Sequence, residues 1–374
     1  MNSRIALYLG GLLGPFGGGV VAAMLPELGA SFDVPQEVAA GSLTAFLLPF
    51  ASVMLVSGSL GERWGMARTI RAAYVAYALA ALLAAVAPWF WAFQVSRALQ
   101  GVANAFTTPL LLAKLAAVTP KERLGRALGT YGAMQSIGQT SAPLVGGLAA
   151  EGAWQWAFVV IAEVATVRAL SPMPPDEPAG ERRRPVPLRE AWRPPVPLAG
   201  GVAFVSWAAL AGLPFLVTFR LDDAHTLSPS ARGLVLTGFG VAGAVTARLT
   251  GGAVDRFGPR AVVASGLLLA AVAVGSIGLV SWLPAVTAAW AVGGICGQLV
   301  LVGLHTTVLG GGTSGSGGVI SVVTALRFLG MAASPAAFTG LYRHDAALGF
   351  LVPALLLVLT VPVVSVWWPR RDRA

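Results

Sequence analysis

The stretch Gly58-Ser-Leu-Gly-Glu62-Arg63-Trp-Gly65 returns later in this chain as Gly251-Gly-Ala-Val-Asp255-Arg256-Phe-Gly258-Pro-Arg260. Each copy follows a long apolar run, and the acidic residues of the two copies lie 193 positions apart. A second pattern, Gly138-Gln-Thr-Ser-Ala142-Pro143, is matched by Gly330-Met-Ala-Ala-Ser334-Pro335 at an offset of 192. Two patterns that repeat at nearly the same offset indicate that the 374 residues form two similar halves in succession.

The composition predicts that both halves lie in a membrane. Apolar residues make up 56% of the chain and charged residues 11%, with a mean hydropathy of +0.75, whereas soluble domains carry about 25% charged residues. Lipid offers the backbone no hydrogen bonds, so long apolar runs must be helical, and membrane β-strands would be shorter and alternating. Twelve runs have the length of a spanning helix: 5–26, 38–60, 70–88, 90–117, 125–149, 153–170, 198–219, 231–253, 261–281, 283–309, 317–341 and 346–368. We therefore predict an all-α membrane protein with six transmembrane helices in each half.

A Pro-, Glu- and Arg-rich segment at 171–197 separates the halves 1–170 and 198–374, and its composition is typical of a cytoplasmic linker. Placing both termini in the cytoplasm puts most of the 25 Lys and Arg residues on the inner side and leaves only Arg220, Arg232 and Arg343 outside. This distribution follows the positive-inside rule and explains the net charge of +9 without a nucleic-acid partner. We expect a multi-pass protein of the plasma (inner) membrane, present as a monomer.

Several other functions are disfavoured by what the chain contains. One cysteine and three histidines, scattered along the sequence, do not suit a metal cluster. A membrane-embedded enzyme would need converging nucleophile, base or metal groups, but Cys296 and His305 stand alone, and His344-Asp345 lies in a short external loop. The sequence has no ring of charges and no filter-like repeat of the kind found in channels, so a channel is also disfavoured. We therefore expect no enzyme activity, no metal and no cofactor.

Several motifs together resemble those of the major facilitator superfamily, and the resemblance extends over the whole chain. The repeated Gly-rich loop matches the family's Gly-x-x-x-Asp/Glu-Arg-x-Gly pattern, with Glu62 in place of the usual Asp in the first copy. Arg97-Ala-Leu-Gln100-Gly101 is similar to its Arg-x-x-Gln-Gly signature, and 138–147 is similar to the span-five motif of proton-coupled antiporters, with Ala142 for the usual Gly. Leu25-Pro26-Glu27-Leu28 resembles drug-efflux members.

The resemblance implies two parallel six-helix bundles that rock about a shared central site. It implies a secondary active transporter that works by alternating access and exports small amphipathic or hydrophobic compounds in exchange for protons. The alternative is an uptake or exchange permease for a small metabolite, with anionic metabolites favoured by an excess of arginine over acid within the spans. For either function the expected partners are a small-molecule substrate and the lipid bilayer.

The resemblance also assigns the repeated loops to a conformational latch that holds the outward-open state, because each acid can accept hydrogen bonds from a helix N-terminus and from arginine. The latch residues are Gly58, Glu62, Arg63, Gly65, Gly251, Asp255, Arg256, Gly258 and Arg260. A solvated loop whose charges only follow the positive-inside rule is the alternative.

Charged residues within spans are costly and therefore mark functional positions. Arg97 lies in the fourth predicted span, and Glu163, an acidic residue in the middle of the sixth, is its expected ion-pair partner. A carboxylate in that setting can load and release a proton, so Glu163 is the candidate coupling acid, with a structural hydrogen bond as the alternative. Arg327 either faces the substrate cavity or extends to the cytoplasmic interface.

Two further groups of residues complete the predicted site. Polar side chains at cavity depth, which either contact substrate or hydrogen-bond between helices, are Asn104, Gln135, Gln139, Gln298 and His305. Small residues and a proline in the fifth span predict a hinge or a close helix contact, and they are Gly138, Pro143, Gly146 and Gly147.

Overall fold

A computed structural model describes residues 3–174, 196–310 and 316–367, and every regular element in these ranges is helical. The chain divides into two compact units: Met1–Pro185 with Thr226–Thr237 (unit 1), and Val186–His225 with Gly238–Ala374 (unit 2). This division differs from the predicted one in the segment 226–237, which belongs with unit 1. Most of the predicted linker, residues 175–195, lies outside the described residues.

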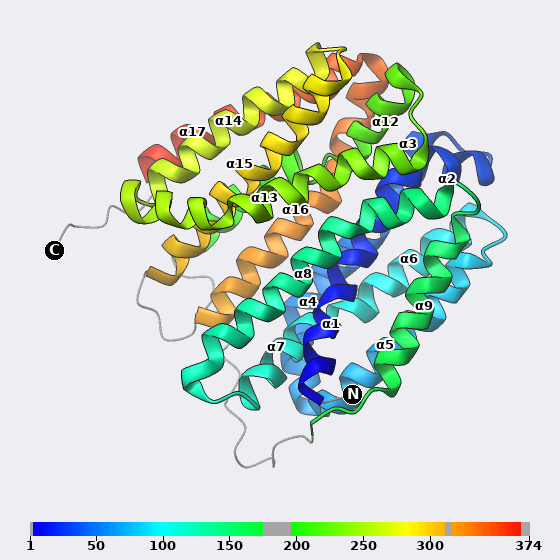
Figure 1. The fold of residues 1–374 in the computed structure, drawn as a ribbon, viewed down its shortest axis with the longest axis vertical. Coiled ribbons are helices and arrows are strands. Elements are labelled where there is room, and N and C mark those ends of the chain that lie inside the picture. Colours follow the sequence, from blue (N-terminus) through cyan, green and yellow to red (C-terminus); the bar gives the residue numbers. More distant parts are fainter. Residues whose placement is uncertain (1–2, 175–195, 311–315, 368–374) are drawn as a thin grey trace. The chain divides into compact units, whose positions relative to one another are not determined.

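Unit 1 is a bundle in which an N-terminal helical span packs against a long central helix (Figure 1). Its elements are α1 (Ser3–Gly19), η1 (Val20–Met24), α2 (Leu25–Ser31), α3 (Gln36–Ala39), α4 (Gly41–Trp64), α5 (Met66–Ala85), α6 (Phe90–Ala105), α7 (Thr108–Ala117), α8 (Lys121–Ala150) and α9 (Gln155–Leu170). The most extensive contacts join α4 to α6, α1 to α8 and α5 to α9. Helix α1 therefore lies against α8 for most of its length.

Unit 2 repeats two of these three contacts with its own helices. They are α11 (Val196–Ser206), the π-helical turn η2 (Trp207–Ala211), α12 (Pro214–His225), α13 (Pro229–Phe257), α14 (Pro259–Leu279), α15 (Leu283–Gly310), α16 (Ser316–His344) and α17 (Ala346–Trp367). Helix α14 packs against α15 and α17, and α11 packs against α16 as α1 packs against α8 in unit 1. The first two turns of α13 belong to unit 1.

Nine helical stretches within the described ranges are long and apolar enough to cross a membrane. They are Ile5–Ser31, Gln36–Gly61, Met66–Ala85, Val196–His225, Pro229–Phe257, Pro259–Leu279, Leu283–Thr307, Val322–His344 and Ala346–Ser365. The predicted span 90–117 is divided into α6 and α7, because Pro109 cannot donate a backbone hydrogen bond in the turn that follows Ala105. The predicted spans 125–149 and 153–170 correspond to α8, which carries several polar residues, and to α9, which has 16 residues.

The sequence repeat corresponds to a repeat in three dimensions. Gly65 and Gly258, 193 positions apart, have φ angles of 94° and 81° and each precedes the first turn of the next helix. Only glycine adopts such angles without strain. An added Cβ at Gly138 would lie within 3.0 Å of the Leu12 carbonyl oxygen, and one at Gly330 would meet the Phe204 carbonyl in the same way. Each half therefore uses matching glycines to bring its helices together.

Candidate functional site

The side chain of Arg97 lies completely buried in the interior of unit 1. Its Nη1 donates a hydrogen bond to Gln100 Oε1 (2.7 Å) and its Nη2 donates one to the Gly17 carbonyl (2.8 Å). The Arg97 Cζ atom lies 4.4 Å from the ring centroid of Phe46, a favourable position for a cation. The expected ion pair with Glu163 is wrong, because carbonyl, amide and aromatic groups surround the guanidinium instead.

Glu163, unlike the buried Arg97, lies on the exposed surface of unit 1. Its side chain is exposed on α9, and the exposed residues around it are Val160, Val164, Val167 and Thr166. Residues three, four and seven positions apart share one face of a helix, so the carboxylate stands in the middle of an apolar face. It forms no ion pair within the described part of the chain. Its role as the coupling acid stays a prediction.

Asn104 continues the polar row that Arg97 begins. It is 2% exposed, and its Nδ2 donates a hydrogen bond to the Gly14 carbonyl (2.9 Å), while its Oδ1 accepts one from the Thr107 hydroxyl (2.8 Å). Gly14 and Gly17 have no side chains, so α6 approaches the α1 backbone closely enough for direct hydrogen bonds. In this arrangement Asn104 joins two helices of unit 1 rather than offering its amide to a substrate.

The predicted packing residues of the fifth span contact two different neighbours of α8, the first span and the start of α13. A Cβ added at Gly138 or Gly146 would collide with the carbonyls of Leu12 and Val20 in the first span. One added at Gly147 would collide with the carbonyl of Pro229 at the start of α13. Pro143 lies inside α8, and its own carbonyl lies against Gly233. These contacts are backbone to backbone, so no larger residue fits; whether α8 also bends as a hinge stays a prediction.

An ion pair that the sequence did not predict lies beside this helix contact. Arg232 is 1% exposed and its Nη2 donates to the Glu27 carboxylate, whose side chain is 27% exposed. Both residues belong to unit 1, although 205 positions separate them. The available sequence signal was the Pro26-Glu27 pair that ends the first span and an isolated arginine in an external segment. Neither feature shows that Glu27 and Arg232 pair with each other.

A second carboxylate caps the start of α13. Glu151, just after α8, accepts hydrogen bonds from the backbone N–H (3.0 Å) and the hydroxyl (2.6 Å) of Ser230. These bonds, made to the charged form, lower the pKa of the exposed Glu151 carboxyl, with a smaller contribution from Arg232. Glu27 and Glu151 together hold the first turn of α13 within unit 1.

The polar residues predicted in the second half are found in unit 2. The guanidinium of Arg327 on α16 lies 5.2 Å from the Trp207 ring centroid and 4.9 Å from that of Phe328. Arg327 is close enough to His305 on α15 for an electrostatic interaction. Both residues and Gln298 are half-buried, and Arg327 has no ion pair within the described ranges. Unit 2 therefore presents a cation among aromatic rings.

The remaining predicted positions contribute less. Gln135 is half-buried and Gln139 exposed on α8, without a hydrogen bond to any described residue. Asp255 is exposed on the last turn of α13 and pairs with no described group, while Arg256 lies over the Phe257 ring. The Glu62 side chain is outside the described residues. The latch stays a prediction. Among the described residues no group of three His, Cys, Asp or Glu side chains could hold a metal ion.

Comparison with known proteins agrees with this architecture. The family model described as Major Facilitator Superfamily matches residues 7–226, more than half of the chain. The chain belongs to the major facilitator superfamily. This superfamily member superposes on the crystal structure of a D-xylose–proton symporter with a TM-score of 0.77, at 15% identity over 98% of this chain and 97% of the other. Its helical membrane fold and its class, a transporter and not an enzyme, follow from this membership.

Two relatives in sequence are named for drug resistance. A multidrug resistance protein B homolog of Mycobacterium tuberculosis is 33% identical over 154 residues, 40% of this chain and 28% of the relative. The puromycin resistance protein of Streptomyces alboniger is 33% identical over 156 residues, 41% of this chain and 31% of the relative. The chain thus matches about a third or less of the length of these relatives.

Proposed function

We propose that this superfamily member is a proton-coupled exporter of small amphipathic or hydrophobic compounds, working by alternating access in the plasma membrane with both termini in the cytoplasm. The observation that carries the proposal is the glycine face of α8. Gly138 and Gly146 contact the first span through the backbone, at the motif that resembles the one of proton-coupled antiporters. The relatives named for resistance to drugs support the same class of substrate.

The test is a transport assay in proteoliposomes that hold the full chain under an imposed pH gradient. Fluorescent amphiphiles of positive, zero and negative charge are offered one at a time, and a pH-sensitive dye reports proton movement. We expect the pH gradient to drive one or more uncharged or cationic amphiphiles across the membrane. We expect the dye to report protons that move through the protein in the opposite direction. Substrate movement that ignores the pH gradient would contradict proton coupling, and movement of anions alone would contradict the substrate class.

Two carboxylates of unit 1 are candidates for the coupling acid. Glu163 is exposed and has no ion pair within the described residues. Glu27 is held by Arg232 and would have to release it on protonation. Glu163→Gln and Glu27→Gln separate these roles: the variant that still moves substrate down its own gradient but no longer responds to pH carries the coupling acid.

The second candidate function is a permease for small anionic metabolites. Arg327 favours it, because this cation lies close to Trp207, Phe328 and His305 in unit 2, and none of the described acids pairs with it. A desolvated arginine attracts carboxylate and phosphate groups strongly. If this reading holds, Arg327→Gln abolishes anion uptake in the same assay, whereas an exporter of uncharged amphiphiles keeps most of its flux.

A further inference from the structure

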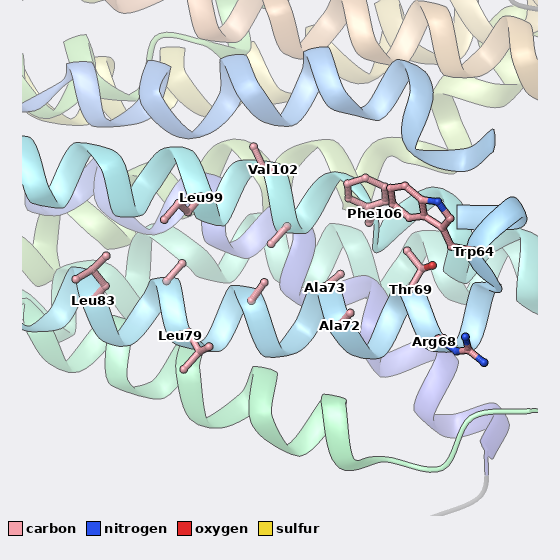
Figure 2. A pocket seen from close by; sticks show the side chains of 13 residues that line it. Trp64, Arg68, Thr69, Ala72, Ala73, Leu79, Leu83, Leu99, Val102 and Phe106 are labelled. Carbon is pink, nitrogen blue, oxygen red and sulfur yellow. The ribbon is translucent and has the colours of Figure 1, made fainter. Parts of the chain in front are cut away.

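An elongated apolar groove runs along the surface of unit 1 between α5 and α6, separate from the polar residues discussed above. Its volume is about 630 Å³, within the range of roughly 300–1,000 Å³ typical of pockets that hold small molecules. Alanines of α5, including Ala72 and Ala76, form part of its lining together with Leu79 and Leu99. Figure 2 shows Ala72 and Leu79 on α5 and Leu99 on α6, two helices that contact each other.

The groove has the dimensions of a lipid chain. On α5 its lining extends from Arg68 to Leu83, which is about 22 Å at 1.5 Å per residue. The hydrocarbon core of a bilayer is about 30 Å thick, so the groove is long enough for an acyl chain of one leaflet, about 15 Å, with the headgroup level at its Arg68 end. Met66–Ala85 is itself long and apolar enough to span a membrane. A groove on a membrane-spanning helix faces the acyl chains of the surrounding lipids.

The two ends of the groove differ in chemistry. Arg68, Trp64 and Phe106 lie at one end, whereas Leu83, Leu79 and Leu99 lie towards the other (Figure 2). Arg68 is exposed and forms no hydrogen bond or ion pair with the described residues. Trp64 is 57% exposed and stacks on Phe106 at a centroid distance of 6.0 Å. An arginine beside a tryptophan at the end of a spanning helix is typical of the membrane interface, where lipid headgroups lie.

We propose that this groove binds one phospholipid with an anionic headgroup. One acyl chain lies along the alanines of α5, and the phosphate accepts hydrogen bonds from the Arg68 guanidinium, which offers several donors to phosphate oxygens. The indole of Trp64 lies at the level of the glycerol and headgroup. Charge complementarity selects the anionic headgroup, since Arg68 is charged and no acid is among the described residues that line the groove. This site does not depend on the substrate or coupling proposed above.

Native mass spectrometry of the delipidated, detergent-purified full chain tests the proposal. Phosphatidylglycerol and phosphatidylcholine with identical acyl chains are added separately at equal concentration. We expect at least threefold more protein carrying one phosphatidylglycerol than carrying one phosphatidylcholine. Equal retention of the two lipids would overturn the headgroup assignment, as would displacement of phosphatidylglycerol by an equal concentration of glycerol phosphate, which has no chains.

Matched variants locate the site. Arg68→Gln is expected to lower phosphatidylglycerol retention to the phosphatidylcholine level, whereas Arg71→Gln, an exposed arginine of α5 that does not line the groove, is expected to keep it. Equal effects of the two changes would contradict the assignment, because they would show only an effect of net charge.

A filling variant tests the chain-binding part of the groove. Ala76→Phe is expected to reduce retention of both lipids at least threefold, while Ala288→Phe, at an exposed alanine of α15, leaves it unchanged. Ala72→Leu is the milder substitute if Ala76→Phe does not yield folded protein. Full retention of lipid in the filled groove would overturn the proposal.

Discussion

Helix α6 of unit 1 and helix α15 of unit 2 occupy repeat-equivalent positions but carry different chemistry. In both, a glycine meets a carbonyl of the second helix of its half: Gly101 lies against Phe46 and Gly294 lies against Phe239, each pair 193 positions from the other. In α6 the neighbouring positions are Arg97, Gln100 and Asn104, whereas 193 positions later they are Trp290, Gly293 and Gly297. The backbone contacts are repeated, and the polar side chains are not.

The aromatic partner is preserved while its contact changes. The Arg97 guanidinium lies 4.4 Å from the Phe46 ring centroid, and the Trp290 ring lies 4.7 Å from that of Phe239. At this equivalent position, the phenylalanine ring therefore contacts a cation in unit 1 and an indole in unit 2. The comparison teaches that glycine positions determine how each half folds, while the residues around them can specialise. Unit 1 specialises in a buried polar network between α1 and α6.

The largest expected effect breaks the shared element. Gly101→Val and Gly294→Val each place a side chain against a carbonyl that cannot move without separating two helices. We expect each to destabilise the protein by more than the ~1–3 kcal/mol of ordinary overpacking, measured as lost monodisperse protein and a lower melting temperature. Gly132→Val, at a position with open space around it, is the control and is expected to fold normally. An intact Gly294→Val protein would show that the second half does not need the contact.

The next effect concerns an element that only one half has. The ion pair of Glu27 with Arg232 has no repeat counterpart. The first span repeats at an offset of 192, as Leu12 and Phe204 do, so Phe219 is equivalent to Glu27; at the offset of 193, Ala39 is equivalent to Arg232. Glu27→Gln removes the carboxylate charge that faces the buried Arg232 guanidinium, and we expect a loss of about 2–3 kcal/mol, less than for a fully buried pair, because the Glu27 side chain is 27% exposed. Thermal unfolding of the two single variants and of Glu27→Gln/Arg232→Gln measures this. Single and double losses that simply add would show that the two groups do not interact.

The third prediction separates a functional from a structural Arg97. Arg97→Met removes hydrogen bonds to a charged group, about 1.5–3 kcal/mol, but also removes the cost of burying a cation in the membrane. We expect the melting temperature to change little and substrate flux to fall at least tenfold, because the contact with the Gly17 carbonyl just before η1 is lost. Trp290→Met is the matched variant in unit 2. Unchanged flux with a large loss of stability in Arg97→Met would make the arginine structural only.

The smallest effect is that of pH on the Glu151 cap. Because hydrogen bonds from Ser230 lower the pKa of Glu151 in the folded protein below its ordinary value of 4.5, their contribution to stability is present above pH 4.5 and is lost as pH falls through the folded pKa. The melting temperature of wild type should therefore exceed that of Glu151→Gln slightly at pH 6, with the difference shrinking below pH 4.5. A difference that stays constant down to pH 3 would remove Glu151 from this role.

Much of the fold could be predicted from the sequence, because lipid imposes strong constraints on composition. The apolar runs predicted the helices. The repeated motifs that end in Gly65 and Gly258 predicted the duplication, since each glycine marks a turn that other residues adopt only with strain. The breaks within spans were not predicted. The 3₁₀ turn at Val20–Met24, the break between α6 and α7 and the π turn at Trp207–Ala211 depend on local competition for backbone hydrogen bonds.

The candidate site was less predictable, because its pairs join distant positions. The pairing of Arg97 with Glu163 assumed that a buried cation needs an acid, whereas the Gly17 carbonyl, Gln100 and the Phe46 ring meet its requirements. The partner of Arg232 could not be found by sequence spacing, because charge alone does not select one acid among several. Hydropathy shows which residues are expensive to bury but not which groups compensate them.

Cysteine accessibility across the membrane tests most directly the claim that the two halves are parallel repeats. Arg63 and Arg256 are exposed at equivalent positions, and the chain's one native cysteine, the buried Cys296, can be replaced by alanine. In that background, Arg63→Cys and Arg256→Cys are labelled with an impermeant maleimide in intact cells and in inverted vesicles. The account predicts that both sites react from the cytoplasmic side only; labelling of the two sites from opposite sides would contradict it.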